Sequence, residues 1–222
     1  MKAIRNIIFD LDGTLIDSSA GVVDSVNYSL RQVGASEQPP EKIKPFIGFP
    51  LSHMYPEFTD APVRTLIGHF QARAAEIMDE KTHPLGGAEE VLRRLHGDGY
   101  RLAIGTTKIR LHIDGILAKL GWTELFEATV GGDEVAKVKP DPEAFRLAAA
   151  RLGAAPEETV VVGDTVNDVL AARAIPMTVI AVNSPYGGRY ELVASRPDAF
   201  IERIGELPDE LKRVHARRER KQ

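Results

Sequence analysis

The chain has 222 residues, of which 43% are hydrophobic and 27% are charged, the balance of an ordinary globular protein with room for one α/β core and a smaller insertion. Its formal net charge of −4 argues against a surface built to neutralise a nucleic-acid backbone, so a small polar partner fits better. Because cysteine is absent, disulfides, thiolate nucleophiles and cysteine zinc sites are excluded, and any metal must be held by oxygen or histidine.

The first predicted element is a short buried strand over residues 7–9. This apolar run of β-formers ends in the tight loop Asp10-Leu11-Asp12-Gly13-Thr14, so the two acids are expected at the carboxyl end of the strand. The run is too short for a signal peptide or a membrane span, which favours cytoplasmic residence and no membrane partner.

The following block, residues 16–83, is predicted to be an inserted helical domain. Helical spacing is seen over residues 20–32 and 63–79, but no convincing strand is found. Residues 1–15 and 84–222 would then form the core domain. Pro84, Gly86 and Gly87 are plausible hinge residues at the second junction.

Beyond the insertion, short apolar segments alternate with helical patterns. The predicted strands are residues 101–105, 128–130 and 159–162, and the predicted helices are residues 88–95, 111–120, 142–152 and 166–174. The alternation predicts a Rossmann-like α/β/α core, in which a parallel sheet is covered by helices on both faces and ligands bind at the carboxyl ends of the strands. The charged residues of the basic segment from Lys212 to Gln222 could lie on one more helix or fray, and a solvated end is the favoured interpretation.

Asp10 and Asp12 are the most informative pair, because two carboxylates two residues apart in a turn can face one small site. Gly13 permits a sharp backbone path beside them. Attack on phosphorus needs an ionised carboxylate and expulsion of an alkoxide needs a proton donor, so the pair could divide these roles. The alternative is a loop that uses Asp and Gly as turn formers.

Asp164 and Asp168 form a second acidic pair. Asp164 follows a predicted strand and Asp168 lies in the first turn of the next helix, so both can point toward the same edge of the sheet. An oxygen-rich site of this kind suits magnesium, although such acids alone more often cap a helix.

Lys139, Thr106 and Thr107 follow the same layout. Lys139 lies on a stiff Lys-Pro loop ahead of a helix, where a fixed cation could offset charge on a phosphoryl group. Thr106 and Thr107 come after a strand and could donate hydroxyls to phosphate oxygens. Singly, each of these features is commonplace in surface loops.

Taken in order, Asp10 to Thr14, Thr106, Lys139 and Gly163 to Asp168 resemble the four motifs of the haloacid dehalogenase superfamily. The resemblance implies that Asp10 is the nucleophile and a magnesium ligand. It further implies that Asp12 is the acid/base and that its backbone carbonyl binds the metal. Asp164 would be a direct metal ligand, and Asp168 a direct or water-mediated one. Lys139, Thr106 and the backbone amides around Leu11 and Asp12 would contact the phosphoryl group.

The insertion is similar to the helical cap of the phosphoglycolate phosphatase and β-phosphoglucomutase branch. Residues 47–51 resemble the cap loop that dips toward the active site, and Lys44 and His53 nearby are candidates for contacting the leaving group. Thr107 stands where that branch usually has Asn, which leaves the substrate open.

The sequence therefore predicts a magnesium-dependent phosphatase that hydrolyses a small phosphorylated metabolite, phosphoglycolate-like or a sugar phosphate, through an aspartyl-phosphate. The alternatives are a phosphate-transferring mutase, a pyrophosphatase, or a catalytically silent binding protein that keeps the fold. Dehalogenation is disfavoured because it would leave Asp12 and the magnesium site without a purpose. A monomer or homodimer without a nucleic-acid partner is expected.

Overall fold

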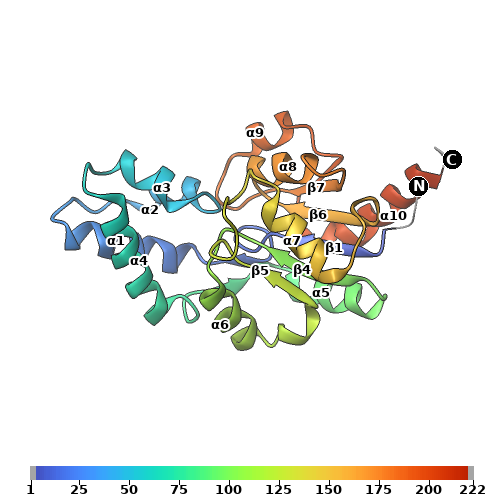
Figure 1. The fold of residues 1–222 in the computed structure, drawn as a ribbon, viewed down its shortest axis with the longest axis horizontal. Coiled ribbons are helices and arrows are strands. Elements are labelled where there is room, and N and C mark those ends of the chain that lie inside the picture. Colours follow the sequence, from blue (N-terminus) through green and yellow to red (C-terminus); the bar gives the residue numbers. More distant parts are fainter. Residues whose placement is uncertain (1–3, 220–222) are drawn as a thin grey trace.

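The computed structural model describes residues 4–219 and contains a six-stranded, fully parallel sheet (Figure 1). The strand order is β5-β4-β1-β6-β7-β8. The strands are β1 (Asn6–Phe9), β4 (Arg101–Gly105), β5 (Ala128–Val130), β6 (Thr159–Gly163), β7 (Thr178–Val182) and β8 (Ala199–Ile201). The parallel sheet is confirmed, while β7 and β8 extend it beyond the predicted strands. Residues 1–3 and 220–222 of the predicted core domain lie outside the described part.

Alternation along the strands creates two apolar layers, one on each face of the sheet. In β1, Ile7 and Phe9 belong to one buried cluster, whereas Ile8 between them belongs to the other. The first cluster includes residues of α5 (Ala88–Gly97), α6 (Arg110–Leu120) and α10 (Leu207–Glu219), and the second those of α7 (Glu143–Leu152), α8 (Val166–Arg173) and α9 (Arg189–Ala194). The predicted three-layer α/β/α core is confirmed.

Local signals fix where the core helices begin and end. The Thr165 side chain accepts a hydrogen bond from the Asp168 amide at the start of α8, and the Asp168 carboxylate accepts one from the Thr165 amide in return. Helices α6 and α7 end at Gly121 and Gly153, whose φ angles of 66° and 60° suit glycine. The loops after the strands are therefore held in defined positions.

The helices of residues 16–83 lie at one end of the molecule, beside the sheet (Figure 1). They are α1 (Ser19–Gln32), α2 (Pro40–Ile43), α3 (Leu51–Met54) and α4 (Val63–Ile77), and α1 packs against α4. Two short antiparallel strands that the sequence did not predict, β2 (Ile16–Asp17) and β3 (His83–Pro84), join this part to the core. That residues 16–83 act as a separate cap domain stays a prediction.

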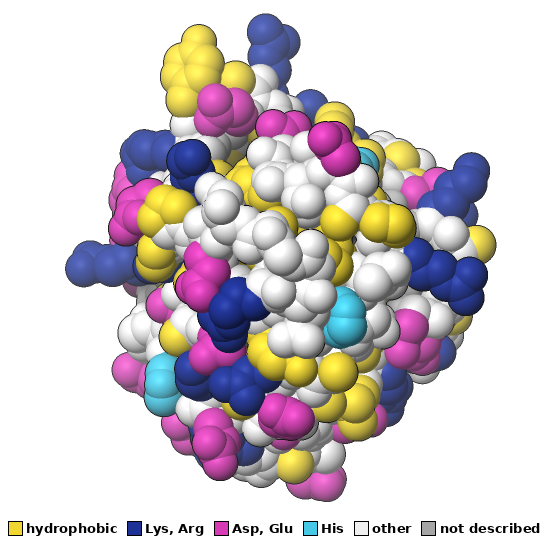
Figure 2. Space-filling view, turned by 90° about the vertical axis from the view of Figure 1, so that its left-hand side faces the viewer, with side chains coloured by type: hydrophobic (Ala, Val, Ile, Leu, Met, Phe, Trp, Pro, Cys, Tyr) yellow, Lys and Arg dark blue, Asp and Glu magenta, His cyan; other side chains and the backbone are white. Residues whose placement is uncertain are grey.

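The face presented by these helices carries Lys and Arg side chains interspersed with Asp and Glu (Figure 2). Apolar side chains lie between the charged ones in the same view. Within residues 4–219, every helix is too short or too polar to cross a bilayer.

The basic C-terminal segment is a helix rather than a solvated end over residues 212–219. Leu211 and Val214 are buried against the core. Glu210, which is 5% exposed, forms ion pairs with Arg213 and Arg217 at 2.9 and 3.0 Å. The less favoured of the two predicted alternatives, a further helix, is the one observed: apolar residues at three-residue spacing anchor one face of the helix, although its many basic residues dominate the composition. Residues 220–222 of this segment lie outside the described part.

Helix α6 offers a matched test of the core. Leu117 is 3% exposed and Leu111 is 63% exposed in the same helix. Leu117→Ala is expected to lower the free energy of unfolding by about 2–5 kcal/mol, because it leaves a cavity. Leu111→Ala should change it by less than about 0.5 kcal/mol. Urea titrations of both variants measure this, and equal losses would contradict the assigned layer.

Candidate active site

The candidate site is built around the loop that follows β1. Asp10 extends the strand pairing, since its amide donates to the Val162 carbonyl at 2.8 Å. The chain then turns sharply at Gly13, which has a φ of 81°, and the Leu15 amide donates back to the Leu11 carbonyl at 2.9 Å. Leu11 is fully buried, so its side chain anchors the loop and does not face a ligand.

Three buried carboxylates converge at this edge of the sheet. Asp10, Asp164 and Asp168 each offer one oxygen, and these three atoms lie within 4.8 Å of one another. They come from the ends of β1 and β6 and from the first turn of α8, as the parallel topology requires. The sequence prediction that these acids meet is therefore fulfilled in the geometry.

Lys139 occupies the middle of the cluster. Its Nζ atom donates to Asp10 Oδ1 and to Asp168 Oδ1, both at 2.6 Å, and its side chain is 1% exposed. The second oxygen of Asp168 accepts hydrogen bonds from the Thr165 amide and hydroxyl at 3.0 and 2.6 Å. Because both Asp168 oxygens have protein donors, a water-mediated metal contact suits it better than a direct one.

Burial dominates the electrostatics of these groups. It raises the pKa of Asp10 to about 6, against the lowering effect of Lys139. The pKa of Asp164 is raised by burial and then by the charges of Asp10 and Asp168. Burial disfavours the charged form of Lys139, but Asp10 and Asp168 outweigh it and raise its pKa. The cluster thus has more negative charge than one ammonium group can balance.

Two carboxylate oxygens show that the site fits a metal ion. Asp10 Oδ2 and Asp164 Oδ2 are buried and have no hydrogen-bond partner within the described structure, whereas buried polar atoms are normally paired. Asp164 Oδ1 accepts from the Thr14 hydroxyl at 3.0 Å. A Cβ atom at Gly13 would lie 2.1 Å from Asp164 Oδ2, so only glycine leaves room for this oxygen. Such a hard, all-oxygen set suits Mg²⁺.

The Asp12 carboxylate stands apart from the cluster. Its Oδ1 accepts a hydrogen bond from the Ser18 hydroxyl, and its Oδ2 lies 3.1 Å from Lys108 Nζ. The side chains of Asp12 and Lys108 are 8% and 7% exposed. Asp10 and Asp12 therefore face different surroundings although they are two residues apart, which permits different chemical roles.

The two predicted threonines follow β4. Thr106 is 2% exposed, its amide donates to the Val130 carbonyl at 3.0 Å, and its hydroxyl accepts from the Lys108 amide at 3.3 Å. The Thr107 hydroxyl instead donates to the Gly48 carbonyl at 3.4 Å. Thr107 thus connects the core to the loop of residues 47–51, which approaches the site as its resemblance to a cap loop implied.

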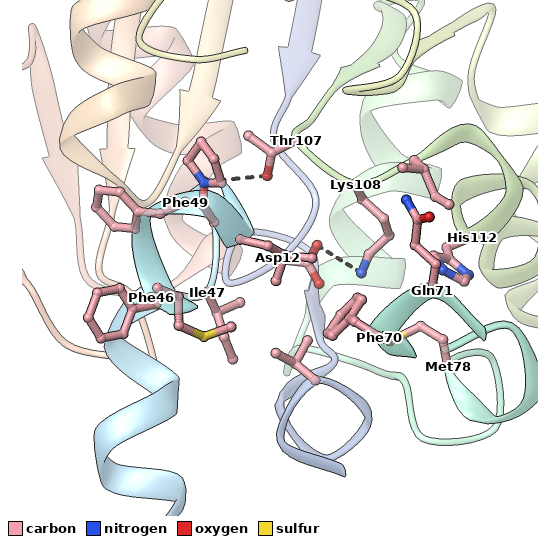
Figure 3. A pocket seen from close by; sticks show the side chains of 16 residues that line it. Asp12, Phe46, Ile47, Phe49, Phe70, Gln71, Met78, Thr107, Lys108 and His112 are labelled. Atoms are coloured by element: carbon pink, nitrogen blue, oxygen red, sulfur yellow. Dashed lines mark hydrogen bonds and ion pairs between the residues drawn. The ribbon is translucent and has the colours of Figure 1, made fainter. Parts of the chain in front are cut away.

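A cavity of about 110 Å³ opens beside Asp12, between the core and the helices of residues 16–83 (Figure 3). Its lining comes from α1, the loop before α3, α3 itself, α4, the residues after it, and the start of α6. Lys44 and His53, the residues predicted to contact a leaving group, are not among the lining residues, and His53 is exposed. Their role in specificity stays a prediction.

Sequence reasoning missed Lys108 and His112, which line this cavity. Lys108 directly follows Thr107, and His112 lies four residues further on. The side chain of His112 is buried, and its Nε2 has no hydrogen-bond partner in the part of the chain described. The i, i+4 spacing of a cation and a histidine after a predicted strand was the available signal.

The amino-acid sequence is similar to those of known proteins. Residues 7–182 match the family model described as haloacid dehalogenase-like hydrolase. The pyrophosphatase PpaX of Bacillus velezensis is 34% identical over 206 residues, which cover 93% of this chain and 95% of the relative. The probable phosphatase IndB of Dickeya dadantii is 32% identical over 208 residues, 90% of each chain.

A solved structure shows the same fold. A hydrolase of the haloacid dehalogenase-like family from Streptococcus pneumoniae superposes with a TM-score of 0.86, covering 95% of this chain and 99% of that one. At 24% identity this similarity concerns the fold alone.

The metal site can be tested without a substrate. Mg²⁺ is expected to raise the melting temperature of the wild-type protein, because an ion that binds the native state stabilises it. In Asp164→Asn, the concentration needed for half of this rise should increase at least about tenfold, since one ligand charge is lost. Asp114→Asn removes an exposed carboxylate of α6 and serves as the control. Identical Mg²⁺ titrations of wild type and Asp164→Asn would refute the site.

Proposed function

The chain belongs to the haloacid dehalogenase-like hydrolases, and on that premise we propose that it is a phosphatase that cleaves small phosphate monoesters through a phosphorylated Asp10. The observation that carries the proposal is that two neighbouring carboxylates have different surroundings. Asp10 has an unpartnered oxygen inside the buried cluster, whereas Asp12 faces the cavity beside it. A nucleophile and a proton donor need these two environments.

The proposed first step is a transfer of the phosphoryl group. A carboxylate oxygen of Asp10 attacks phosphorus, the bond between phosphorus and the ester oxygen breaks, and Asp12 gives its proton to that oxygen. Lys139 offsets negative charge beside Asp10, which it contacts at 2.6 Å.

In the proposed second step, water releases the phosphate. Asp12 takes a proton from water, the water oxygen bonds to phosphorus, and the bond between phosphorus and Asp10 breaks. Asp10 is thereby restored as a carboxylate and Asp12 as an acid. Lys108 and the Ser18 hydroxyl contact the Asp12 side chain and position it beside the cavity.

Mg²⁺ is the proposed cofactor. The carboxylates of Asp10 and Asp164 would hold it directly and Asp168 through water, with the Asp12 carbonyl added by family resemblance. When bound, the ion supplies positive charge that lets phosphate oxygens approach a site otherwise rich in carboxylates.

The helices of residues 16–83 are proposed to be a cap that covers a small leaving group. The contact of Thr107 with Gly48 supports this, because it joins the loop of the cap to the core next to Asp12. Cytoplasmic location and a monomeric or homodimeric state stay predictions.

Pyrophosphate is the second candidate substrate, favoured by the name of the Bacillus velezensis relative. A phosphate-transferring mutase would use the same two carboxylates but would retain the phosphate on its product. Measuring inorganic phosphate release from monoesters and pyrophosphate, with Mg²⁺ and then with EDTA, separates these activities from each other and from a silent binding protein.

Asp10→Asn tests the nucleophile. The amide is a poor nucleophile and removes a charge from the cluster, so kcat should fall to less than about one hundredth of the wild-type value. The control Asp114→Asn should keep full activity. A kcat above that limit in Asp10→Asn would exclude Asp10 as the nucleophile.

Asp12→Ala tests the proton donor through the leaving group. The variant should lose more kcat/KM for an alkyl phosphate than for p-nitrophenyl phosphate, because p-nitrophenolate leaves without protonation. The ratio kcat/KM reports the steps up to and including the first irreversible one, which is cleavage of the ester. Phosphate is released from Asp10 after that step, so the rate of its release does not change kcat/KM. Equal losses for both substrates would argue against acid catalysis by Asp12.

A further inference from the structure

The cavity beside Asp12 is the place where a leaving group must lie if the proposed function holds. The Asp12 carboxylate forms part of its wall, so a group whose oxygen is protonated by Asp12 extends into it. Figure 3 shows two sides around this carboxylate: Phe46, Ile47 and Phe49 on one, and Gln71, Lys108 and His112 on the other.

Most of the wall is apolar. The cap helices and loop contribute aliphatic, sulfur-containing and aromatic side chains, and the core adds Ile109. The apolar lining residues are Val22, Phe46, Ile47, Phe49, Pro50, Leu51, Met54, Phe70, Met78 and Ile109. A wall of this kind favours an apolar occupant, because a hydroxylated or charged group would lose hydration there with few partners to replace it.

The polar side chains of the wall are few: Gln71, Thr107, Lys108 and His112, beside Asp12. Thr107 donates to Gly48, and Lys108 is paired with Asp12. Among the described residues that line the cavity, Lys108 is the single permanent cation. Burial, followed by the charge of Lys108, lowers the pKa of His112, so its imidazole is neutral at physiological pH and offers one polar contact at Nε2. A second phosphate would therefore meet no uncommitted cation there.

The size of the cavity limits the occupant. Its volume is about 110 Å³, and an apolar cavity of about 150 Å³ accommodates benzene. The present cavity is smaller than that, so a chain of about four to six carbons is enough to fill it. Nucleosides and polymers are too large for it.

From these observations the geometry points to a substrate class: small organic phosphate monoesters with a mostly apolar leaving group of about four to six carbons, rather than pyrophosphate or sugar phosphates. The inference rests on the proposed phosphatase activity and concerns the leaving-group side of the same site. Specificity then comes from Phe49, Leu51 and Phe70 rather than from Lys44 and His53.

The test uses n-alkyl phosphates from ethyl to octyl together with inorganic pyrophosphate, with Mg²⁺ and the full chain. The leaving groups of this series have nearly equal reactivity, so differences in kcat/KM report the cavity. The expected result is a rise of about fourfold per added methylene until the cavity is filled, with butyl phosphate hydrolysed more efficiently than pyrophosphate. A flat or falling series, or a preference for pyrophosphate, would overturn the inference.

A matched pair of variants locates the effect. Leu51→Ala removes apolar lining and should lower the butyl-to-ethyl ratio of kcat/KM at least about threefold. Ile67→Ala removes a half-buried aliphatic side chain of α4 that does not line the cavity, and should leave the ratio unchanged. If both variants lower the butyl-to-ethyl ratio equally, the preference for longer chains depends on the stability of the helices of residues 16–83 and not on the lining of the cavity.

Binding of n-alkylphosphonates, which cannot be hydrolysed, separates this inference from the proposed function. If no ester releases phosphate but phosphonate affinity rises with chain length, the phosphatase activity fails and the apolar pocket stands. If esters are hydrolysed without dependence on chain length, the activity stands and the apolar substrate class fails.

Discussion

The buried ammonium group of Lys139 lets Asp10 and Asp168 lie close together in the interior. Three carboxylates within 4.8 Å would repel one another strongly without it. With Asp10, Asp164 and Asp168 ionised, the cluster has a formal charge of −3, and Lys139 reduces this to −2. The remaining charge of −2 equals in size the charge of a divalent cation. Binding of such an ion would also lower the raised pKa values of Asp10 and Asp164. The charge of the cluster is thus compatible with a divalent metal ion.

The same loop separates two carboxylates that are nearly adjacent in the sequence. Gly13 turns the backbone with a positive φ, and its missing side chain leaves room for Asp164. Asp10 stays in the buried cluster while Asp12 points to the cavity and contacts Lys108. The apolar layers on both faces of the sheet hold this loop in place, because β1 lies between β4 and β6.

Much of the fold and site follows from local sequence signals. Short apolar strands that end in Gly, Asp or Thr predict both the parallel sheet and the edge where Asp10 and Asp164 meet. Strands β7 and β8 were both missed. In β8 only Ile201 is buried, which gives a weak signal, whereas β7 ends in a buried apolar run that the sequence did offer. Helix α10 was only the less favoured alternative for its segment, because its basic residues obscure a sparse apolar face.

The cavity could not be predicted from nearness along the chain. Lys44 and His53 flank the cap loop, but side-chain direction decides which residues face the core, and Phe46 and Phe49 line the cavity instead. The pairing of Lys108 with Asp12 spans nearly half of the chain, so it depends on how β1 and β4 lie side by side.

The most direct test of the account is to trap the phosphorylated enzyme. Asp12→Ala, which should slow the attack of water, is mixed with p-nitrophenyl phosphate and Mg²⁺, quenched rapidly in acid, digested and analysed by mass spectrometry. A phosphoryl group on the peptide that contains Asp10, absent when Asp10→Asn is added to the variant, is the predicted result. A phosphoryl group on another residue, or phosphate release without any labelled peptide, would contradict it.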